Sequence, residues 1–79
     1  MNYQQVIVRD PAIMLGKPII AGTRITVEHI MRKLAGGFSV EDILAGYPHL
    51  TRNQVLTALE YAANLIAHEV VIETGPSAQ

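Results

Sequence analysis

Cysteine is absent from this chain of 79 residues, and the absence removes two kinds of site. A chain without cysteine forms no disulfide and offers no thiolate to a metal ion. A small chain without cross-links fits the reducing cytoplasm better than the secretory pathway, so we expect a cytoplasmic protein. Because one core in so short a chain supplies only ~3 to 5 kcal/mol, we also expect stabilisation by self-association as a homodimer.

Long hydrophobic runs are also missing. No window of the sequence approaches the ~18 apolar residues that a membrane span requires. Residues 1–9 lack the basic stretch followed by an apolar run that marks a signal peptide. We therefore expect an untargeted protein with no membrane partner.

The sequence also lacks a strong excess of positive charge, since its net charge is -1. Phosphate neutralisation normally supplies much of the affinity for DNA, so this balance is unusual for a nucleic-acid-binding protein. The charge is uneven, however. Residues 1–52 hold all six Lys and Arg against four acids, a balance of +2, whereas residues 53–79 hold three Glu and no Lys or Arg. This asymmetry permits a basic face and an acidic tail with different partners.

The N-terminal part has the composition of short β structure. The β-branched run of residues 6–8 ends at Asp10-Pro11, which is typical of a brief strand before a turn. Residues 19–25 place two apolar pieces on either side of Gly22, a pattern typical of a tight hairpin or an irregular arm. We expect this arm to pack on helices or to pair with the same segment of a second chain, because a lone hairpin is marginally stable.

Helical signals begin at Thr26, which is placed to cap a first helix that ends at Gly36-Gly37. Ser39 and Asp42 have the spacing of a capping box, and Gly46 ends the short second helix that follows them. These two segments alternate apolar and polar residues with helical spacing.

Thr51 and Gln54 form a second capping-box pattern, which opens the longest helix, to about His68. At about 100° per residue, this helix has an apolar stripe and a polar face on the opposite side. The expected inward stripe is Val55, Leu59, Ala62 and Ile66, and the expected outer face is Asn53, Thr57, Glu60, Tyr61 and Asn64.

The sequence thus predicts a single, mainly α domain with a β arm over residues 1–25, a three-helix core over 26–68 and a C-terminal tail over 69–79. A short second helix followed by a turn and a long third helix matches a homeodomain-like helix-turn-helix. An ordinary three-helix bundle fits the same pattern.

The start of the third helix offers groups that can contact DNA. Asn53, Gln54 and Thr57 can hydrogen-bond base edges, and Arg52 can hold a phosphate. Capping and solvation explain Asn53 and Gln54 equally well. We expect affinity for an operator to depend on these four residues if the protein binds DNA.

No catalytic or metal-binding arrangement is visible in the sequence. Gly16-Lys17 lacks the upstream glycine of a phosphate-binding loop, and Pro18 stands where that loop needs Ser or Thr. The three histidines are too far apart for the i, i+4 pair of a helical metal site. We therefore expect no enzyme activity, no cofactor and no metal.

Several short motifs together resemble domain of unknown function 433, a family of small prokaryotic proteins related to VapB-type antitoxins. The similarity covers roughly Val8 to Ala63, and its combined motif is specific although each fragment alone is weak. The motifs are Asp10-Pro11, Gly16-Lys17-Pro18, Gly22-Thr23-Arg24, Gly36-Gly37-Phe38-Ser39, Glu41-Asp42-Ile43-Leu44 and Tyr47-Pro48-His49-Leu50-Thr51. The resemblance implies a homeodomain-like helix-turn-helix. It also implies, for some members, an antitoxin that pairs with a PIN-domain ribonuclease toxin and represses its own operon.

Two further sites complete the hypotheses. Arg24, after a glycine turn, can reach a phosphate or a carboxylate of a partner, and an internal bond to a helix C-terminus is the alternative. If the protein is an interaction or dimerisation module that does not bind DNA, the apolar residues Val70, Val71 and Ile72 are the expected partner-binding segment. The leading hypothesis is a dimeric DNA-binding antitoxin-like protein.

Overall fold

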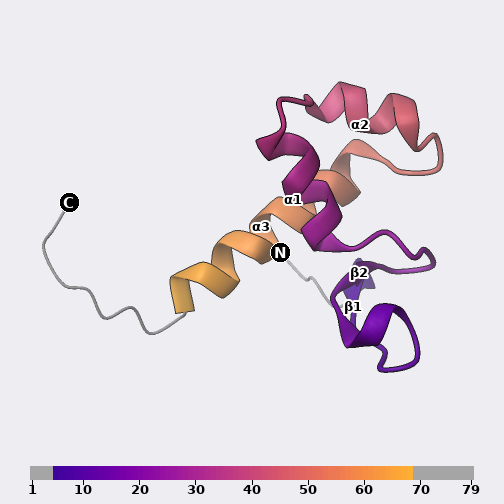
Figure 1. The fold of residues 1–79 in the computed structure, drawn as a ribbon, viewed down its shortest axis with the longest axis vertical. Coiled ribbons are helices and arrows are strands. Elements are labelled where there is room, and N and C mark those ends of the chain that lie inside the picture. The colour runs from indigo at the N-terminus through magenta and orange to yellow at the C-terminus, as the bar shows by residue number, and fades with distance from the viewer. Residues whose placement is uncertain (1–4, 69–79) are drawn as a thin grey trace, which may run out of the picture.

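The computed structural model describes residues 5–68 and shows three helices and one small sheet. In Figure 1, α1 and α2 lie on one side of the long α3, and the sheet lies at the foot of α1. The elements are β1 (Ile7–Val8), the short 3-10 turn η2 (Met14–Gly16), β2 (Ile19–Ile20), α1 (Val27–Ala35), α2 (Val40–Gly46) and α3 (Arg52–His68). The predicted mainly α fold with a short N-terminal β structure is confirmed.

The sheet joins β1 to β2 in an antiparallel pair, with Ile7 opposite Ile20 and Val8 opposite Ile19. Beyond β2 the chain turns back at Gly22, and Ile19 forms an isolated bridge with Thr26. The predicted return of the chain around Gly22 is therefore present, but the main partner of β2 is β1 rather than the second half of its own turn. Both strands place an isoleucine in the core beneath the helices, so the arm packs on the helices.

All three helices begin at the predicted caps. The Thr26 hydroxyl caps α1. At α2, the Ser39 hydroxyl accepts from the backbone N–H of Asp42, and the Asp42 carboxylate accepts from the backbone N–H of Ser39. These bonds from Ser39 hold the pKa of Asp42 below its ordinary value. At α3, Thr51 and Gln54 exchange the same pair of bonds, at 2.8 and 3.1 Å.

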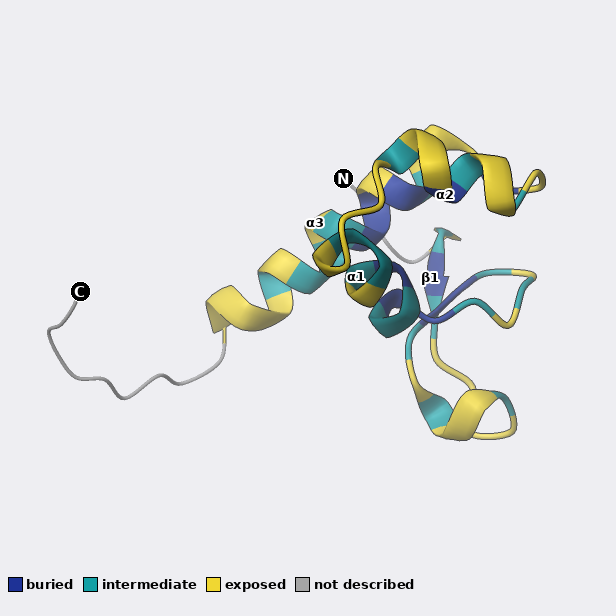
Figure 2. Ribbon diagram, turned by 45° about the horizontal axis from the view of Figure 1, so that its top comes forward, coloured by how far each residue is buried: buried dark blue, intermediate teal, exposed yellow. Residues whose placement is uncertain are grey.

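One apolar core lies where the sheet and the three helices meet. Figure 2 shows the buried segments gathered at this junction and the exposed segments on α2 and on the far end of α3. The buried cluster consists of Ile7, Ile20, Val27, Ile30, Ile43, Leu50, Val55 and Ala58. The core therefore covers only the first half of α3.

Two predictions about α3 are wrong. Thr57, expected on the outer face, is only 1% exposed, and Ile66, expected in the inward stripe, is 66% exposed. The first half of α3 contacts α1, α2 and β1, so its buried arc is broader than one stripe and includes Thr57. The stripe itself continues to Ile66, but the covering elements end before they reach it (Figure 1).

Some predictions fall beyond the part that the structure describes. The tail over 69–79, with the predicted partner-binding residues Val70, Val71 and Ile72, lies outside the described residues. Within residues 5–68, no helix is both long enough and apolar enough to cross a membrane.

Candidate functional site

Two turns that are distant in sequence lie side by side and enclose a hollow of about 420 Å³. One is the turn after β2, and the other is the connection between α2 and α3. The lining residues are Gly22, Thr23, Arg24, Ile25, Gly46, Tyr47, Pro48, His49 and Leu50. Two of the motifs that carry the family resemblance therefore meet at one surface.

Arg24 also lines two adjoining hollows. A larger one, of about 650 Å³, lies between this turn and residues 8–13, and a smaller one, of about 370 Å³, includes Met14, Thr26, His29 and Tyr47. The walls of the two smaller hollows are mostly aliphatic or aromatic side chains, whereas the larger one also includes Arg9 and Asp10. We call this surface, formed by the three hollows that share Arg24, the Arg24 face.

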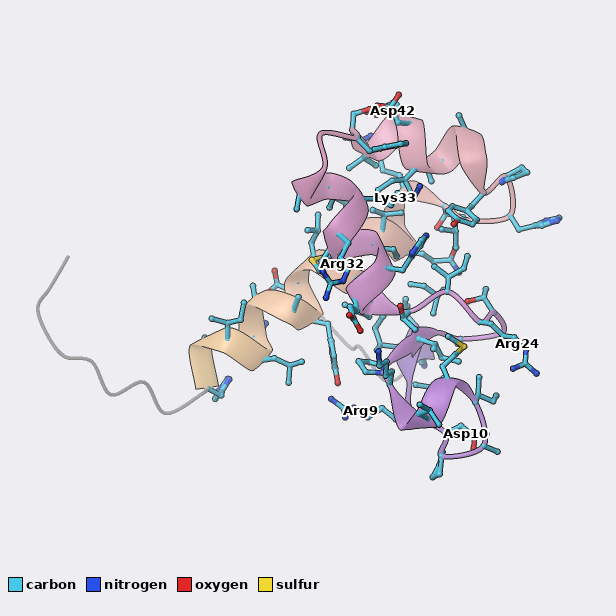
Figure 3. The ribbon with its side chains drawn as sticks, viewed as in Figure 1. Arg9, Asp10, Arg24, Arg32, Lys33 and Asp42 are labelled. Carbon is cyan, nitrogen blue, oxygen red and sulfur yellow. The ribbon has the colours of Figure 1, made fainter. Side chains whose placement is uncertain are left out.

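Local hydrogen bonds hold the turn that presents Arg24. Gly22 has a φ of +81°, a conformation that glycine adopts without steric cost. The Thr23 hydroxyl donates to the carbonyl of Ile20 at 2.8 Å and accepts from the N–H of Ile25 at 3.0 Å. Thr23 thus ties both ends of the turn together, and Figure 3 shows Arg24 projecting from it, away from the helices.

The opposite wall is held by a contact between α1 and the connection after α2. The Nε2 atom of His29 lies 2.8 Å from the hydroxyl of Tyr47, and their rings meet edge to face with centroids 6.0 Å apart. This contact fixes Tyr47, which lines two of the three hollows.

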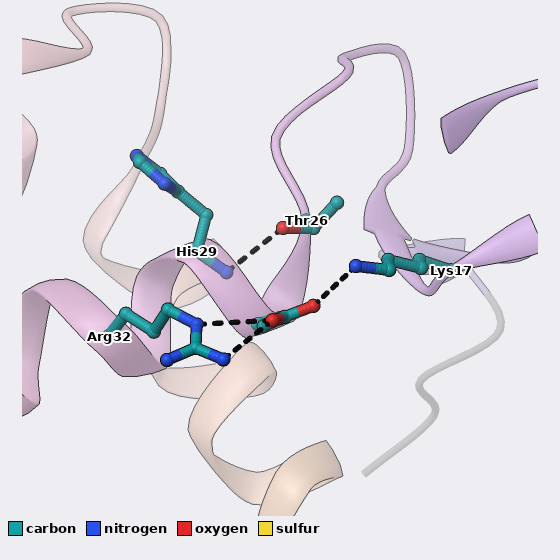
Figure 4. Close-up of polar contacts among 5 residues, drawn as sticks. Lys17, Thr26, His29 and Arg32 are labelled. Carbon is teal, nitrogen blue, oxygen red and sulfur yellow. Dashed lines mark hydrogen bonds and ion pairs between the residues drawn. The ribbon is translucent and has the colours of Figure 1, made fainter. Parts of the chain in front are cut away.

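Two other cations in the first part of the chain share one carboxylate. Lys17 lies 2.7 Å from Glu28, and Arg32 lies 3.0 Å from the same side chain, one helical turn along α1 (Figure 4). Hydrogen bonds from Lys17 and then Arg32 hold the pKa of Glu28 below its ordinary value. Both cations are therefore neutralised at the surface.

Arg52 and Arg9 also have partners. Arg52 forms an ion pair with Glu41, and Arg9 donates to the hydroxyl of Tyr61 at 3.1 Å. Arg24, in contrast, makes no hydrogen bond or ion pair within residues 5–68. The structure thus shows no bond from Arg24 to a helix C-terminus within that range.

The structure does not gather the predicted DNA-contacting residues on one outward surface. Arg52 and Asn53 are exposed at the start of α3, but Arg52 is paired with Glu41. Gln54 is half-buried and takes part in the capping box, and Thr57 is buried. Only the first two side chains are presented together. Within residues 5–68, no three His, Cys, Asp or Glu side chains lie close enough to hold a metal ion.

Sequence reasoning missed most of the Arg24 face. It singled out Arg24, but it did not place residues 46–50 beside it. The sequence feature that could have connected the two segments is that both belong to the motifs that carry the family resemblance. No periodicity or spacing connects two turns that are more than 20 residues apart.

Comparison with known proteins agrees with this architecture, that of a small, mainly helical domain with a two-stranded sheet. The sequence profile of the family described as "Protein of unknown function (DUF433)" matches residues 7–62. The chain therefore belongs to the DUF433 family, as predicted.

The chain is also similar to two individual proteins. The chain is 32% identical over 59 residues to "Uncharacterized protein y4eO" of Sinorhizobium fredii (strain NBRC 101917 / NGR234), and the match covers 75% of this chain and 27% of that protein. The crystal structure of a DUF433 member protein from Anabaena variabilis ATCC 29413 is similar, with a TM-score of 0.77 and 28% identity, over 81% of this chain and 63% of that one. The chain thus spans about a quarter of the first relative and under two thirds of the second.

The extent of the family match separates two parts of the molecule. The Arg24 face lies wholly within residues 7–62, whereas the last turns of α3 lie beyond them. The Arg24 face is therefore a hollowed surface within the segment shared with the family.

Proposed function

We propose that this chain is a protein-interaction module that docks an acidic, partly apolar segment of a partner protein on the Arg24 face. The observation that carries the proposal is the state of Arg24, an exposed cation without a carboxylate partner in residues 5–68, at the junction of three hollows. This function was the alternative on sequence grounds, and the burial of Thr57 and the pairing of Arg52 now favour it over DNA binding.

The chemistry of the face suits a peptide with a carboxylate. A guanidinium forms two parallel hydrogen bonds with a carboxylate, which fixes the orientation of the bound group as well as its charge. Ile25, Pro48 and Leu50 provide apolar walls beside it, as in other binding sites with a few polar groups. Arg24 beside these apolar walls favours an acidic residue flanked by apolar ones, and Arg9 and Asp10 line the hollow of about 650 Å³ together with it.

Exposed apolar side chains extend the same surface. Met14 lines a hollow together with Arg24, and the neighbouring Leu15 is 92% exposed. Leu15 also has a φ of +59°, a left-handed conformation that costs a side-chain-bearing residue roughly 1 to 2 kcal/mol. A strained turn that displays an apolar side chain is typical of a contact site.

The family resemblance suggests which partner to test. It points to a VapB-type antitoxin in the cytoplasm that neutralises a PIN-domain ribonuclease toxin. In that role the Arg24 face would engage carboxylates of the toxin. The antitoxin relationship rests on the resemblance alone.

The test is to co-express the chain with the product of the adjacent coding sequence and to measure the affinity of the complex by calorimetry. We expect Arg24→Ala to weaken binding at least tenfold, because it removes the one cation that lines all three hollows of the face. Arg32→Ala is the matched control, since it removes an exposed arginine of α1 that is already paired with Glu28. Equal affinities for the wild type and Arg24→Ala would contradict the proposal.

A second candidate function is DNA binding through a helix-turn-helix formed by α2, the connection over residues 47–51 and α3. The supporting observation is that Arg52 and Asn53 are exposed side by side at the start of a 17-residue helix. Such a protein would bind an operator upstream of its own gene and repress it, with Asn53 reading a base and Arg52 holding a phosphate.

Fluorescence anisotropy with a duplex from the upstream region tests this second candidate. Affinity should fall steeply with salt, and Arg52→Ala should weaken binding to every sequence. An affinity that changes neither with salt nor with Arg52→Ala would exclude this mode of DNA binding.

A further inference from the structure

The end of α3 carries large apolar side chains that the rest of the chain leaves exposed. Figures 1 and 2 show it extending beyond α1, α2 and the sheet, with exposed residues along its length. Leu65 is 47% exposed and Ile66 is 66% exposed. Large exposed apolar side chains that adjoin one another mark contact surfaces more often than isolated ones do.

These side chains continue the face that α3 turns toward the core. At about 100° per residue, Leu65 and Ile66 lie on either side of the line through Ala58 and Ala62. Ala58 is buried and Ala62 is packed against the core. The exposed residues are thus an extension of the core-facing stripe beyond the core of a single chain.

We propose that a second copy of this chain covers this extension, through antiparallel packing of the two α3 helices. The sequence of the segment is complementary to itself in this arrangement. If the helices cross at the level of residue 64, Ala62 of each chain lies level with Ile66 of the other, so a small side chain faces a large one. Such alternation lets two helices approach closely and interdigitate.

Charge agrees with a second copy as the occupant. Residues 61–67 contain no Asp, Glu, Lys or Arg, so two copies meet there without repulsion between like charges. A closed two-fold pair is also the commonest form of self-association. The contact differs from the pairing of N-terminal strands that the sequence suggested, because β1 and β2 already pack on the helices of their own chain.

Sedimentation equilibrium of the full chain tests the pairing. The mass should rise from 8.6 kDa toward twice that value as concentration increases. The association should be weak, because two short helical segments bury less area than a standard interface. Ile66→Glu should raise the dissociation constant at least tenfold.

Leu56→Glu is the matched control. Leu56 is also a large, exposed residue of α3, but it lies on a different side of the helix, so its replacement should leave the dissociation constant within twofold. Circular dichroism checks that both variants keep the wild-type helix content. A chain that stays monomeric at 500 µM, or a dimer that Ile66→Glu does not weaken, would overturn the proposal.

Cross-linking tests the antiparallel geometry. The chain has no native cysteine, so a mixture of Ala62→Cys and Ile66→Cys chains with different tags can form only engineered disulfides. We expect rapid disulfide formation between the two different chains. Cross-links confined to pairs of identical chains would contradict the antiparallel arrangement.

Discussion

The Arg24 face and the outer half of α3 are two exposed surfaces that differ in structure, in charge and in their relation to the family. The Arg24 face is built mainly from turns, lies within the segment shared with the DUF433 family, and presents the cation Arg24 where three hollows meet. The outer half of α3 is regular helix, lies beyond that segment, and carries exposed aliphatic side chains without charge. The first surface suits selective recognition of a charged group. The second suits association through burial of apolar side chains, which has little directional preference.

The two surfaces also differ in how they are held. Thr23 and the contact between His29 and Tyr47 fix the walls of the Arg24 face through side-chain hydrogen bonds. The outer half of α3 has less support, since Ala62 packs against the core but Leu65 and Ile66 beyond it have little cover. Substitutions should therefore affect the two surfaces separately, and the following predictions use that separation.

The largest expected effect separates the core from the outer half of α3. Ile30 is fully buried, so Ile30→Ala should lower the free energy of unfolding by about 2 to 5 kcal/mol. Ile66→Ala, measured at a concentration where the chain is monomeric, should change it by less than about 0.5 kcal/mol. Urea denaturation of both variants measures the difference, and similar losses would show that Ile66 is covered within one chain.

The next effect concerns the turn that presents Arg24. Thr23→Val removes a hydroxyl that makes two hydrogen bonds, and it should lower the free energy of unfolding by about 1 to 3 kcal/mol. The same change should weaken partner binding while it leaves the mass of the dimer unchanged. Thr23→Ser keeps the hydroxyl and serves as the control. An effect on self-association would show that the two surfaces are coupled.

A smaller effect is expected at the start of α2, away from both surfaces. Ser39→Ala removes one half of the capping box and should lower the free energy of unfolding by about 1 kcal/mol. Thermal unfolding by circular dichroism measures this loss. Neither partner binding nor self-association should change by more than twofold.

The smallest effect is the dependence of stability on pH. The pKa values of Glu28 and Asp42 are lower in the folded chain than in the unfolded one, so the unfolded chain binds more protons in acid. Their stabilising contribution is complete above the ordinary carboxyl pKa of about 4 and is lost as the pH falls below it. Asp42→Asn should flatten the acid limb of a plot of the unfolding midpoint against pH. An unchanged acid limb would contradict the role of the capping box.

The features that could be predicted from the sequence are the local ones. The caps at Thr26, Ser39 and Thr51 depend on groups within three residues of each other, and all three predictions are confirmed. Thr57 was placed wrongly because its burial depends on how many elements surround the first half of α3. Ile66 was assigned to the correct stripe, but helical spacing does not reveal where the covering elements end.

The candidate site was predictable only in part, for the same reason. Arg24 follows a glycine turn, which the sequence shows directly. The other wall, residues 46–50, comes into place only when α2 and the connection after it pack on α1 and the sheet. Non-local contacts of this kind follow from tertiary packing rather than from any spacing along the chain.

The most direct test of the central claim is a charge exchange at the Arg24 face, with the partner protein as the second component. Arg24→Glu should abolish binding of the wild-type partner, and replacing the acidic residue of the partner's docking segment with Arg should restore at least a tenth of the original affinity. A wild-type affinity that Arg24→Glu leaves within twofold would contradict the account.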